Sequence, residues 1–299
     1  MRIGVVILPE LRTAALRATW ARAEQLGFAH AWTYDHLAWR GLRDSTWFAA
    51  VPTLAAAALA TERLRLGILV ASPNFRHPVP FARELIALDD LTGGRFTLGL
   101  GAGGEGWDAT ILGQKPWSIR ERADRFGEFV ALTDQLLRQP ATTATGRYYS
   151  AVEARSVPGC VQQPRIPFAI AATGPRGMRL AARYGQLWAT TGDRRRQGPI
   201  AAAAGAAMVR EQMDRLEDAC AQVGRDPASL PRLVLSGTVL DGGLASADTF
   251  GETIQRYAEV GVTDFVVHWP RPNEPYVGDV ARFERIITEH MGTAGAAAR

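Results

Sequence analysis

The sequence predicts an α/β fold in which eight strand–helix units close into a parallel barrel. Strand and helix patterns alternate along almost the whole chain, which is typical of βα units. Several strands are apolar on both faces, as parallel strands that are covered on both sides require. The length of 299 residues suits eight such units, because barrels of this kind often reach about 250 residues or more as one domain.

Eight segments have the composition of buried strands. They cover residues 2–8, 29–34, 64–70, 96–100, 168–172, 186–191, 232–240 and 264–269. Between them, apolar residues recur at spacings of three and four, which predicts helices that include 14–26, 80–91, 120–137 and 201–223. This order fits a TIM (β/α)8 barrel, and a doubly wound open sheet is the structural alternative.

Residues 140–167 interrupt the alternation of strands and helices. This segment lacks helical spacing and contains several glycine and proline turn signals. We therefore expect an insertion between the fourth helix and the fifth strand. We take the segment as part of the same domain and not as a second one, so residues 1–299 are predicted to form one domain.

The fourth strand is the most informative segment. It reads Gly93-Gly-Arg-Phe-Thr-Leu-Gly-Leu-Gly-Ala-Gly-Gly104, a turn followed by a strand with a small-residue face and a glycine loop. Because glycine has no Cβ, such a loop lets a ligand approach the backbone where the strand ends. The loop also matches G-x-G-x-x-G, but a dinucleotide site needs a helix that begins at the last glycine, and helical spacing resumes only near Ser118. This difference favours the barrel.

The composition is ordinary for a globular protein, with 47% hydrophobic and 21% charged residues. The N-terminal apolar run is short and is interrupted by Pro9, so no signal peptide is expected. The alanine-rich run at 54–60 is far shorter than the about 20 residues of a membrane span. Cys160 and Cys220 cannot form a metal site alone, and we expect no disulfide between them. The protein is predicted to be cytoplasmic.

The net charge of +4 is weak evidence for a nucleic-acid partner. Nearly all basic residues are arginines, and they are scattered among acidic residues along the predicted helices. The compact run Arg194-Arg195-Arg196 is typical of a solvated loop. We expect neither nucleic acid nor a membrane as a partner.

In a βα barrel the active site lies where the strands end. The second strand ends in Tyr34-Asp35-His36, with Trp39 close behind. A histidine in this setting suits proton transfer or a hydrogen bond to a cofactor ring, and the alternative is a structural histidine. No histidines have metal-ligand spacing and no G-x-S-x-G elbow occurs, so neither a metal site nor a hydrolase triad is expected.

The fifth and sixth strands end in residues that suit an anion. Thr173-Gly174-Pro175 has the pattern of a helix start, where unpaired N–H groups and a partial positive charge attract phosphate. Thr191-Gly192 offers a hydroxyl and another open N–H. The alternative is that both segments are only caps and turns.

These segments together resemble the luciferase-like monooxygenase superfamily of flavin- and deazaflavin-dependent oxidoreductases. The resemblance lies in Ile3-Gly-Val-Val-Ile-Leu-Pro9, Ala23-Glu-Gln-Leu-Gly-Phe28, Tyr34-Asp-His36, Ala60-Thr-Glu-Arg-Leu-Arg-Leu-Gly67, the Gly93–Gly103 segment, Ile166-Pro-Phe-Ala-Ile-Ala-Ala-Thr-Gly-Pro175 and Ala181-Ala-Arg-Tyr-Gly185. It is good over residues 1–192 and loose over the last third. The sequence is most similar to the branch that uses coenzyme F-420, an 8-hydroxy-5-deazaflavin.

The resemblance implies a barrel whose mouth binds the deazaflavin ring. It implies that Asp35 and His36 lie beside the ring, that Trp39 helps to form the substrate wall, and that a non-proline cis peptide between Leu69 and Val70 backs the ring. His36, Trp39 and Glu105 are the implied catalytic residues, with Glu105 as a proton donor or substrate contact. The other cofactor contacts are expected from Gly103, Gly104, Thr173, Gly174, Thr191 and Gly192.

The implied activity is hydride transfer between coenzyme F-420 and an organic substrate. Arg194-Arg195-Arg196 would then meet the anionic oligoglutamate tail of the coenzyme. An FMN-dependent monooxygenase on the same barrel is the alternative, and a non-catalytic flavin-binding protein is a second one. Tryptophans expected around the mouth favour a lipophilic or ring-bearing substrate, namely Trp39, Trp107, Trp117 and Trp269. The family also implies a homodimer.

Overall fold

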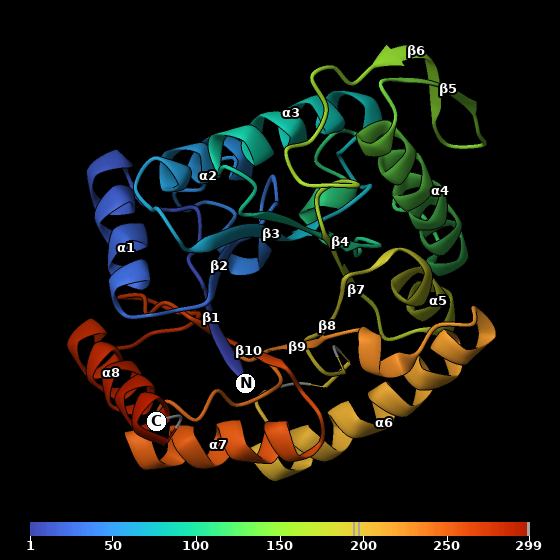
Figure 1. The fold of residues 1–299 in the computed structure, drawn as a ribbon. Helices are drawn as coiled ribbons and strands as arrows, with labels where there is room; N and C mark the ends of the chain where they lie inside the picture. The colour runs from blue at the N-terminus through green and yellow to red at the C-terminus, as the bar shows by residue number, and fades with distance from the viewer. Residues whose placement is uncertain (194, 197, 298–299) are drawn as a thin grey trace.

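Eight parallel strands form a closed barrel at the centre of the molecule. The computed structural model describes residues 1–193, 195–196 and 198–297. The barrel strands are β1 (Arg2–Val6), β2 (His30–Thr33), β3 (Arg65–Ala71), β4 (Phe96–Gly101), β7 (Phe168–Ala171), β8 (Leu187–Thr190), β9 (Arg232–Leu235) and β10 (Asp264–His268). They close in the order β1-β10-β9-β8-β7-β4-β3-β2 (Figure 1). The predicted TIM barrel is confirmed.

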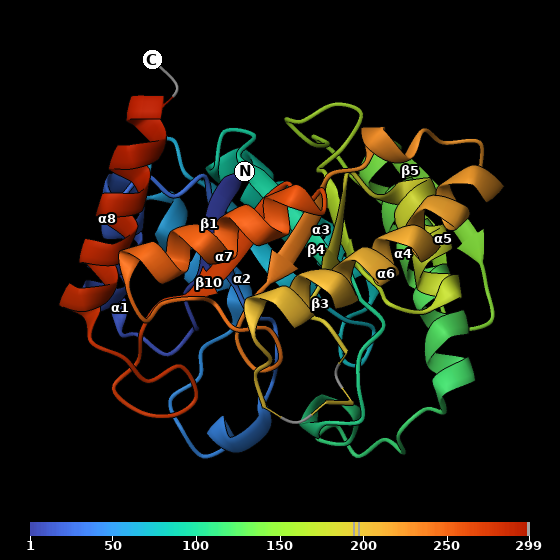
Figure 2. The same cartoon turned by 90° about the horizontal axis from the view of Figure 1, so that it is seen from below.

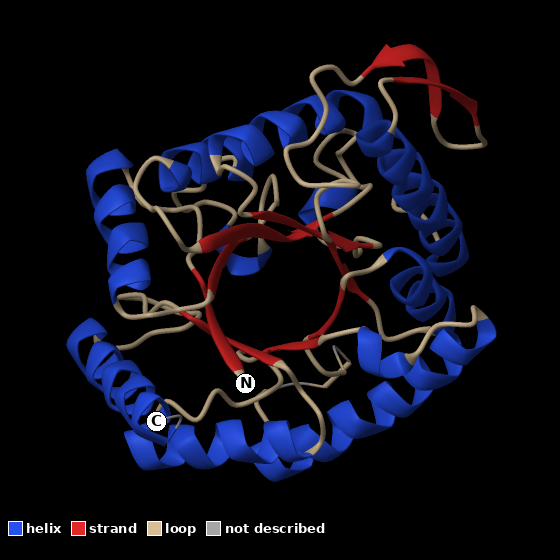
Figure 3. Cartoon of the chain, viewed as in Figure 1, coloured by secondary structure: helices blue, strands red, loops and turns tan. Residues whose placement is uncertain are grey.

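The helices surround the strands, as Figure 3 shows. They are α1 (Thr13–Gln25), α2 (Ala50–Ala58), α3 (Pro78–Leu91), α4 (Ile119–Arg138), α5 (Pro175–Tyr184), α6 (Ala202–Gln222), α7 (Ala247–Glu259) and α8 (Val280–Ala297), with 3₁₀ turns η1 (Arg40–Leu42), η2 (Trp107–Ala109) and η3 (Pro227–Ser229). Local signals start several of them: Ser118 and Glu121 form a capping box at α4, and proline occupies the first turn of α3 and of α5. Within the described residues, no helix has the length and apolar character that crossing a membrane requires.

The barrel strands bury both of their faces. On one face, residues such as Val5 and Phe265 join a core that also contains helix residues such as Trp20. On the other face, Val6 and Val266 pack in a second cluster of strand and loop residues that fills the barrel. Side chains alternate between the faces of a strand, so two buried faces require the continuous apolar runs seen in the sequence.

The seventh barrel strand is shorter than predicted. β9 ends at Leu235, and the prediction that the strand continues to residue 240 is wrong. Gly237 has φ +137°, and its N–H donates to the carbonyl oxygen of Leu240 at 2.7 Å. The chain therefore turns where the prediction continued it, because an apolar run does not report a glycine turn inside it.

The predicted insertion between the fourth helix and the fifth barrel strand is confirmed. It contains the antiparallel pair β5 (Ala141–Thr145) and β6 (Ser150–Arg155), which lies outside the ring of helices (Figure 1). Glu128 of α4 holds the turn of this hairpin, accepting hydrogen bonds from the N–H groups of Tyr148 at 2.9 Å and Tyr149 at 2.5 Å. A Cβ on Gly146 would lie 2.0 Å from Oε1 of Glu128 and 2.9 Å from the carbonyl oxygen of Tyr149, so a larger residue there would displace the Glu128 carboxylate from the turn.

Candidate active site

A cavity of about 840 Å³ opens at the carboxyl ends of the barrel strands. Its lining comes from the segments after β2, β3, β4, β7, β8 and β9, from the start of α4 and from the loop after β10. Figure 2 shows the loops that contain η1 and η2 on the same side of the molecule. Ligand pockets are typically about 300–1,000 Å³, so the cavity has the size of a cofactor or substrate site.

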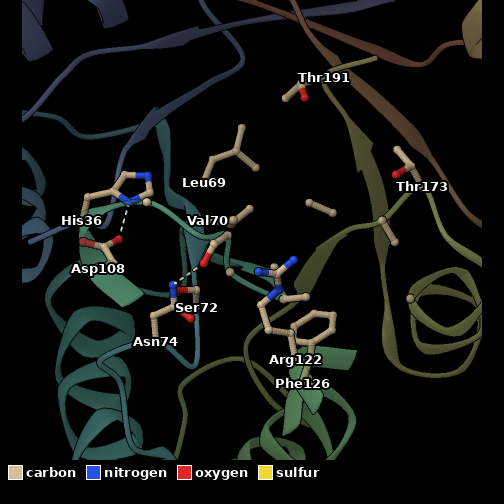
Figure 4. Close-up of a pocket in the computed structure, with 18 of the residues that line it drawn as sticks. His36, Leu69, Val70, Ser72, Asn74, Asp108, Arg122, Phe126, Thr173 and Thr191 are labelled. Atoms are coloured by element: carbon tan, nitrogen blue, oxygen red, sulfur yellow. Dashed lines mark hydrogen bonds and ion pairs between the residues drawn. The ribbon is translucent and has the colours of Figure 1, made fainter. Parts of the chain in front are cut away.

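His36 lines the cavity and is held by Asp108. Nδ1 of His36 lies 2.5 Å from Oδ2 of Asp108, as the dashed line in Figure 4 shows. The other carboxylate oxygen accepts a hydrogen bond from the N–H of Leu37 at 2.8 Å. The His36 side chain is 28% exposed and that of Asp108 only 6%. A buried carboxylate thus orients an accessible imidazole.

Asp108 is a site residue that the sequence analysis missed. It is 72 residues from His36 in the sequence, and η2 brings it under the loop that follows β2. The signal available in the sequence was an acidic residue after the glycine loop, and that signal led to Glu105. Glu105 does line the cavity, but its side chain is 68% exposed and forms an ion pair with Arg122 at 3.0 Å.

Asp35 has a different position from the one expected. Its buried carboxylate accepts hydrogen bonds from Arg76 at 2.7 and 2.9 Å, and Asp35 is not among the residues that line the cavity. The Asp35 carboxylate therefore forms an ion pair behind the cavity wall, beside His36 in the sequence, and its contact with a cofactor stays a prediction.

The glycines of β4 make room for the chain itself. A Cβ on Gly99 would lie 2.2 Å from the carbonyl oxygen of Ile68, and one on Gly101 would lie 2.6 Å from Cγ2 of Val70. A Cβ on Gly103, where φ is +77°, would meet the Asn74 amide at 2.5 Å. β3 and its following loop therefore pack closely against these glycines. Gly101, Gly103 and Gly104 also line the cavity, where the sequence predicted that a ligand can approach the backbone, and their contact with a ligand stays a prediction.

The peptide bond between Leu69 and Val70 is cis, as the resemblance implied. Both residues line the cavity, between His36 and the far wall in Figure 4. Gly103 and Gly104 line the same cavity, and the Gly104 carbonyl accepts a hydrogen bond from Asn74 at 3.2 Å. Ser72 and Asn74, neither of which was predicted, complete this part of the lining.

Thr173, Gly174, Thr191 and Gly192 all line the side of the cavity away from His36, where Figure 4 shows the two threonines. Gly174 is the N-cap of α5, and no side chain caps that helix, so its first N–H groups remain for a ligand. The N–H of Gly192 is not open as expected. It donates to the Thr190 hydroxyl at 3.1 Å, so this position offers less to an anion than predicted.

Only two of the four tryptophans expected at the mouth line the cavity among the described residues, namely Trp39 and Trp107. Trp117 instead packs against Tyr148, with 5.6 Å between ring centroids, and Trp269 packs against Phe283 at 5.4 Å. The expectation for these two is corrected, because a tryptophan in a barrel can equally fill the space between elements.

The arginine run lies partly outside the described residues, because Arg194 is not described. Arg195 is exposed and forms an ion pair with Asp193 at 2.9 Å. Hydrogen bonds from Arg195 lower the pKa of Asp193 to about 2. Neither Arg195 nor Arg196 lines the cavity. In the described ranges, no group of three or more histidine, cysteine, aspartate or glutamate side chains could hold a metal ion.

Fold and cavity together define a (β/α)8 barrel with a ligand-sized cavity at the strand ends, where barrel enzymes have their active sites. Residues 1–249 match the family model of the luciferase-like monooxygenases. The chain belongs to this family.

Relatives of similar sequence include enzymes that use F-420. An F-420-dependent glucose-6-phosphate dehydrogenase from Beutenbergia cavernae is 39% identical over 180 residues, 58% of this chain and 52% of that protein. An F-420-dependent hydroxymycolic acid dehydrogenase from Mycobacterium tuberculosis is 34% identical over 189 residues, 62% of this chain and 51% of that protein. A 4-hydroxyprotoasukamycin monooxygenase from Streptomyces nodosus subsp. asukaensis is 35% identical over 167 residues, 54% of this chain and 43% of that protein. The chain spans about half the length of these curated relatives.

Solved structures with the same fold cover nearly the whole chain. An F-420-dependent secondary alcohol dehydrogenase in complex with an F-420–acetone adduct has a TM-score of 0.80 and 18% identity, over 96% of this chain and 97% of that chain. A coenzyme F-420-dependent tetrahydromethanopterin reductase from Methanopyrus kandleri has a TM-score of 0.75 and 17% identity, over 97% of both chains. At these identities the likeness establishes the fold alone.

Proposed function

We propose that the protein is an oxidoreductase that binds coenzyme F-420 in the cavity and transfers a hydride between it and an organic substrate. The observation that carries the proposal is the His36–Asp108 pair, a buried carboxylate that orients an imidazole at the edge of a cofactor-sized cavity. The names of the F-420-dependent relatives support the choice of cofactor.

The residues present fit such a cofactor. The cavity is large enough, its floor beside Leu69 and Val70 is apolar, and the uncapped start of α5 offers N–H donors to an anionic group. We propose that Leu69, Val70, Gly103 and Gly104 contact the ring side, and that Thr173, Gly174, Thr191 and Gly192 contact the phosphate side. Asp35 would support this arrangement from behind the wall through Arg76.

The cofactor and the protein would each supply part of the chemistry. Bound F-420 supplies a hydride carrier that reacts little with oxygen. Because an ionised carboxylate only accepts hydrogen bonds, we assign the His36 proton to Nδ1, which lies 2.5 Å from Oδ2 of Asp108, and this leaves Nε2 to exchange a proton with the substrate. In the oxidative direction, Nε2 accepts the proton of a substrate hydroxyl. In the reductive direction, Nε2 returns it. Trp39 would form part of the wall against which the substrate packs, and Glu105 would contact the substrate at the rim.

An FMN-dependent monooxygenase is the second candidate. It is supported by the family description and by the relative that is a monooxygenase. A flavin-binding protein without catalysis is a weaker third candidate, because a carboxylate-oriented imidazole in an open cavity is an arrangement for chemistry rather than for storage.

Three further expectations stay predictions, namely the single domain over residues 1–299, the homodimer and the cytoplasmic location. The free thiols of Cys160 and Cys220 are compatible with that location.

A binding titration with F-420 and, separately, with FMN tests the proposal. Absorbance and fluorescence would follow each cofactor as purified protein is added. We expect one-to-one binding of F-420 that is at least tenfold tighter than that of FMN. Tighter binding of FMN would overturn the proposal and make oxygen-dependent chemistry the leading candidate.

A further inference from the structure

A group of ring side chains on one side of the cavity is larger than the proposed hydride transfer requires. Tyr34, Trp39 and Tyr276 line the cavity, and His268 lies behind them; we call these four residues the aromatic wall. Tyr276 stacks on His268 with 3.5 Å between ring centroids and on Trp39 with 6.1 Å. The Tyr34 hydroxyl lies 2.7 Å from Nε2 of His268. The wall is one connected assembly from the loop after β2, from β10 and from the loop after β10.

The loop that carries Tyr276 is held firmly in place. The buried guanidinium of Arg271 donates to Glu10 at 2.6 and 2.7 Å and to the carbonyls of Asn273 and Pro275. The Arg271 N–H donates to the Tyr276 carbonyl at 2.9 Å. A Cβ on Gly237 would lie 2.8 Å from the Tyr276 ring, so glycine makes room for the ring. The ring surface is thus preorganised, which reduces the entropy lost when a ligand packs against it.

The wall itself is uncharged at neutral pH, and one cation lies beside it. Burial and the positive charge of Arg40 lower the pKa of His268 to about 3, so its ring is neutral. Arg40 lines the cavity, with its guanidinium carbon 5.2 Å from the centroid of the Trp39 ring. A guanidinium that lies on an aromatic face is well suited to bind a ligand with a planar, negatively charged group.

Arg40 differs from the other arginines that line the cavity. Arg122 is paired with Glu105 at 3.0 Å, and Arg176 is paired with Asp124 at 2.5 Å. Arg40 has no carboxylate partner in the described part of the chain, so its charge is available to a ligand. Arg40 has φ +47°, a backbone conformation that glycine adopts without strain and other residues rarely adopt. An arginine at such a position indicates a role for its side chain.

We propose that the aromatic wall and Arg40 form the substrate subsite, and that this subsite selects a flat ring that carries an anionic substituent. The ring would pack on Trp39 and Tyr276, and the anion would pair with the Arg40 guanidinium. The assignment of the ligand as a substrate rests on the proposed function, whereas the binding preference rests on the geometry of the wall alone.

Three probes test the subsite by calorimetric titration: 2-naphthoate, the neutral 2-naphthamide of the same shape, and hexanoate, an anion without a ring. We expect naphthoate to bind about threefold to tenfold tighter than naphthamide, as one partly exposed ion pair allows, and hexanoate to bind weakest. Arg40→Gln should remove the preference for naphthoate. Arg43→Gln is the matched control, because Arg43 is an exposed neighbour that stacks on Trp107 and does not line the cavity.

Variants of Tyr276 separate the ring contact from the charge. Tyr276→Ala should weaken the binding of both naphthyl probes to the same extent, and Tyr276→Phe should retain it.

Equal affinity for naphthoate and naphthamide, or a preference that survives Arg40→Gln, would overturn the proposal. Each titration is repeated with F-420 present, and F-420 binding is measured separately. Loss of F-420 binding with an intact Arg40-dependent preference would refute the proposed function but not the subsite, and the reverse result would refute only the subsite.

Discussion

Individual side chains at the site depend on buried partners from distant parts of the chain. Asp108 positions His36, Arg76 holds Asp35, and the hydroxyl of Tyr34 bonds to His268. Buried polar groups need such partners, because an unpaired one costs about 1–3 kcal/mol. At this scale, the partner decides whether a residue is presented to the cavity or withdrawn from it.

Replacing Asp108 should impair turnover more than replacing Glu105. Asp108→Asn leaves the shape of the side chain but no longer fixes the His36 proton on Nδ1, so we expect kcat to fall about tenfold or more with little change in KM. Glu105→Gln is the matched control and should change kcat less, because Glu105 is exposed and paired with Arg122. Steady-state kinetics with any substrate that the wild-type protein turns over with F-420 would check this. Equal losses in the two variants would contradict the assignment of Asp108.

His268 should make stability depend on pH. The unfolded chain binds a proton at this imidazole near pH 6.5, but the folded protein does so only near pH 3. The contribution of the neutral His268 to the free energy of unfolding is therefore complete above pH 6.5. It declines as the pH falls toward 3, by about 1.4 kcal/mol per pH unit at most. We expect a loss on the order of 2 kcal/mol at pH 5. Urea unfolding at pH 7.5 and pH 5 should show a smaller loss for His268→Gln, and an identical loss in both proteins would refute the prediction.

At the scale of elements, the close packing of β4 against β3 determines the shape of the cavity floor. The small residues of β4 allow β3 to approach, and the cis peptide between Leu69 and Val70 lies at this contact. Well-packed interiors resist added volume, since each extra methyl group must displace neighbouring atoms. The role of these glycines is therefore mainly in the scaffold of the site.

Adding a methyl group should have opposite effects at two glycines. Gly99→Ala would place a Cβ 2.2 Å from the backbone oxygen of Ile68, so β3 must move. We expect a loss of about 1–3 kcal/mol in the free energy of unfolding and weaker F-420 binding. Gly127→Ala in α4 meets nothing within 4 Å and should stabilise the protein by about 0.5–1 kcal/mol. Denaturant unfolding of both variants checks this, and a neutral Gly99→Ala would contradict it.

At the scale of the whole molecule, the barrel closes where the first and last strands meet. The buried carboxylate of Asp264 accepts hydrogen bonds from His30 at 2.9 Å, Arg2 at 2.9 Å and Thr263 at 2.6 Å. Burial alone would raise the pKa of Asp264, but these hydrogen bonds lower it to about 2. This network joins β1, β2 and β10 at the amino ends of the strands, the end opposite the cavity.

Removing the Asp264 charge should weaken barrel closure. We expect Asp264→Asn to lower the free energy of unfolding at pH 7 by on the order of 2 kcal/mol. The contribution is present above the ordinary pKa of 3.8 and is lost as the pH falls toward 2. Glu284→Gln is a matched control, since its ion pair with Arg22 also joins the two ends of the chain but is partly exposed. Thermal unfolding should show a larger decrease for Asp264→Asn than for Glu284→Gln, and the reverse order would argue against the network.

The order of strands and helices, the barrel and the insertion were determined by the sequence itself. Apolar periodicity, proline and glycine positions and capping residues act over a few residues, so they can be read locally. The strand pattern also indicated His36 at a strand end, and the resemblance to the family implied the cis peptide between Leu69 and Val70. The cofactor-contact and catalytic roles of the predicted site residues stay predictions.

Only the tertiary structure decided which side chains meet. Asp108 reaches His36 across 72 residues, Tyr276 reaches Trp39 from the loop after the last barrel strand, and Asp35 turns to Arg76 instead of the cavity. These contacts depend on loop conformations and on which loops lie side by side around the barrel. A linear pattern of residue types carries little of that information, because the energy that selects such contacts arises from burial and hydrogen bonding between segments far apart in the chain.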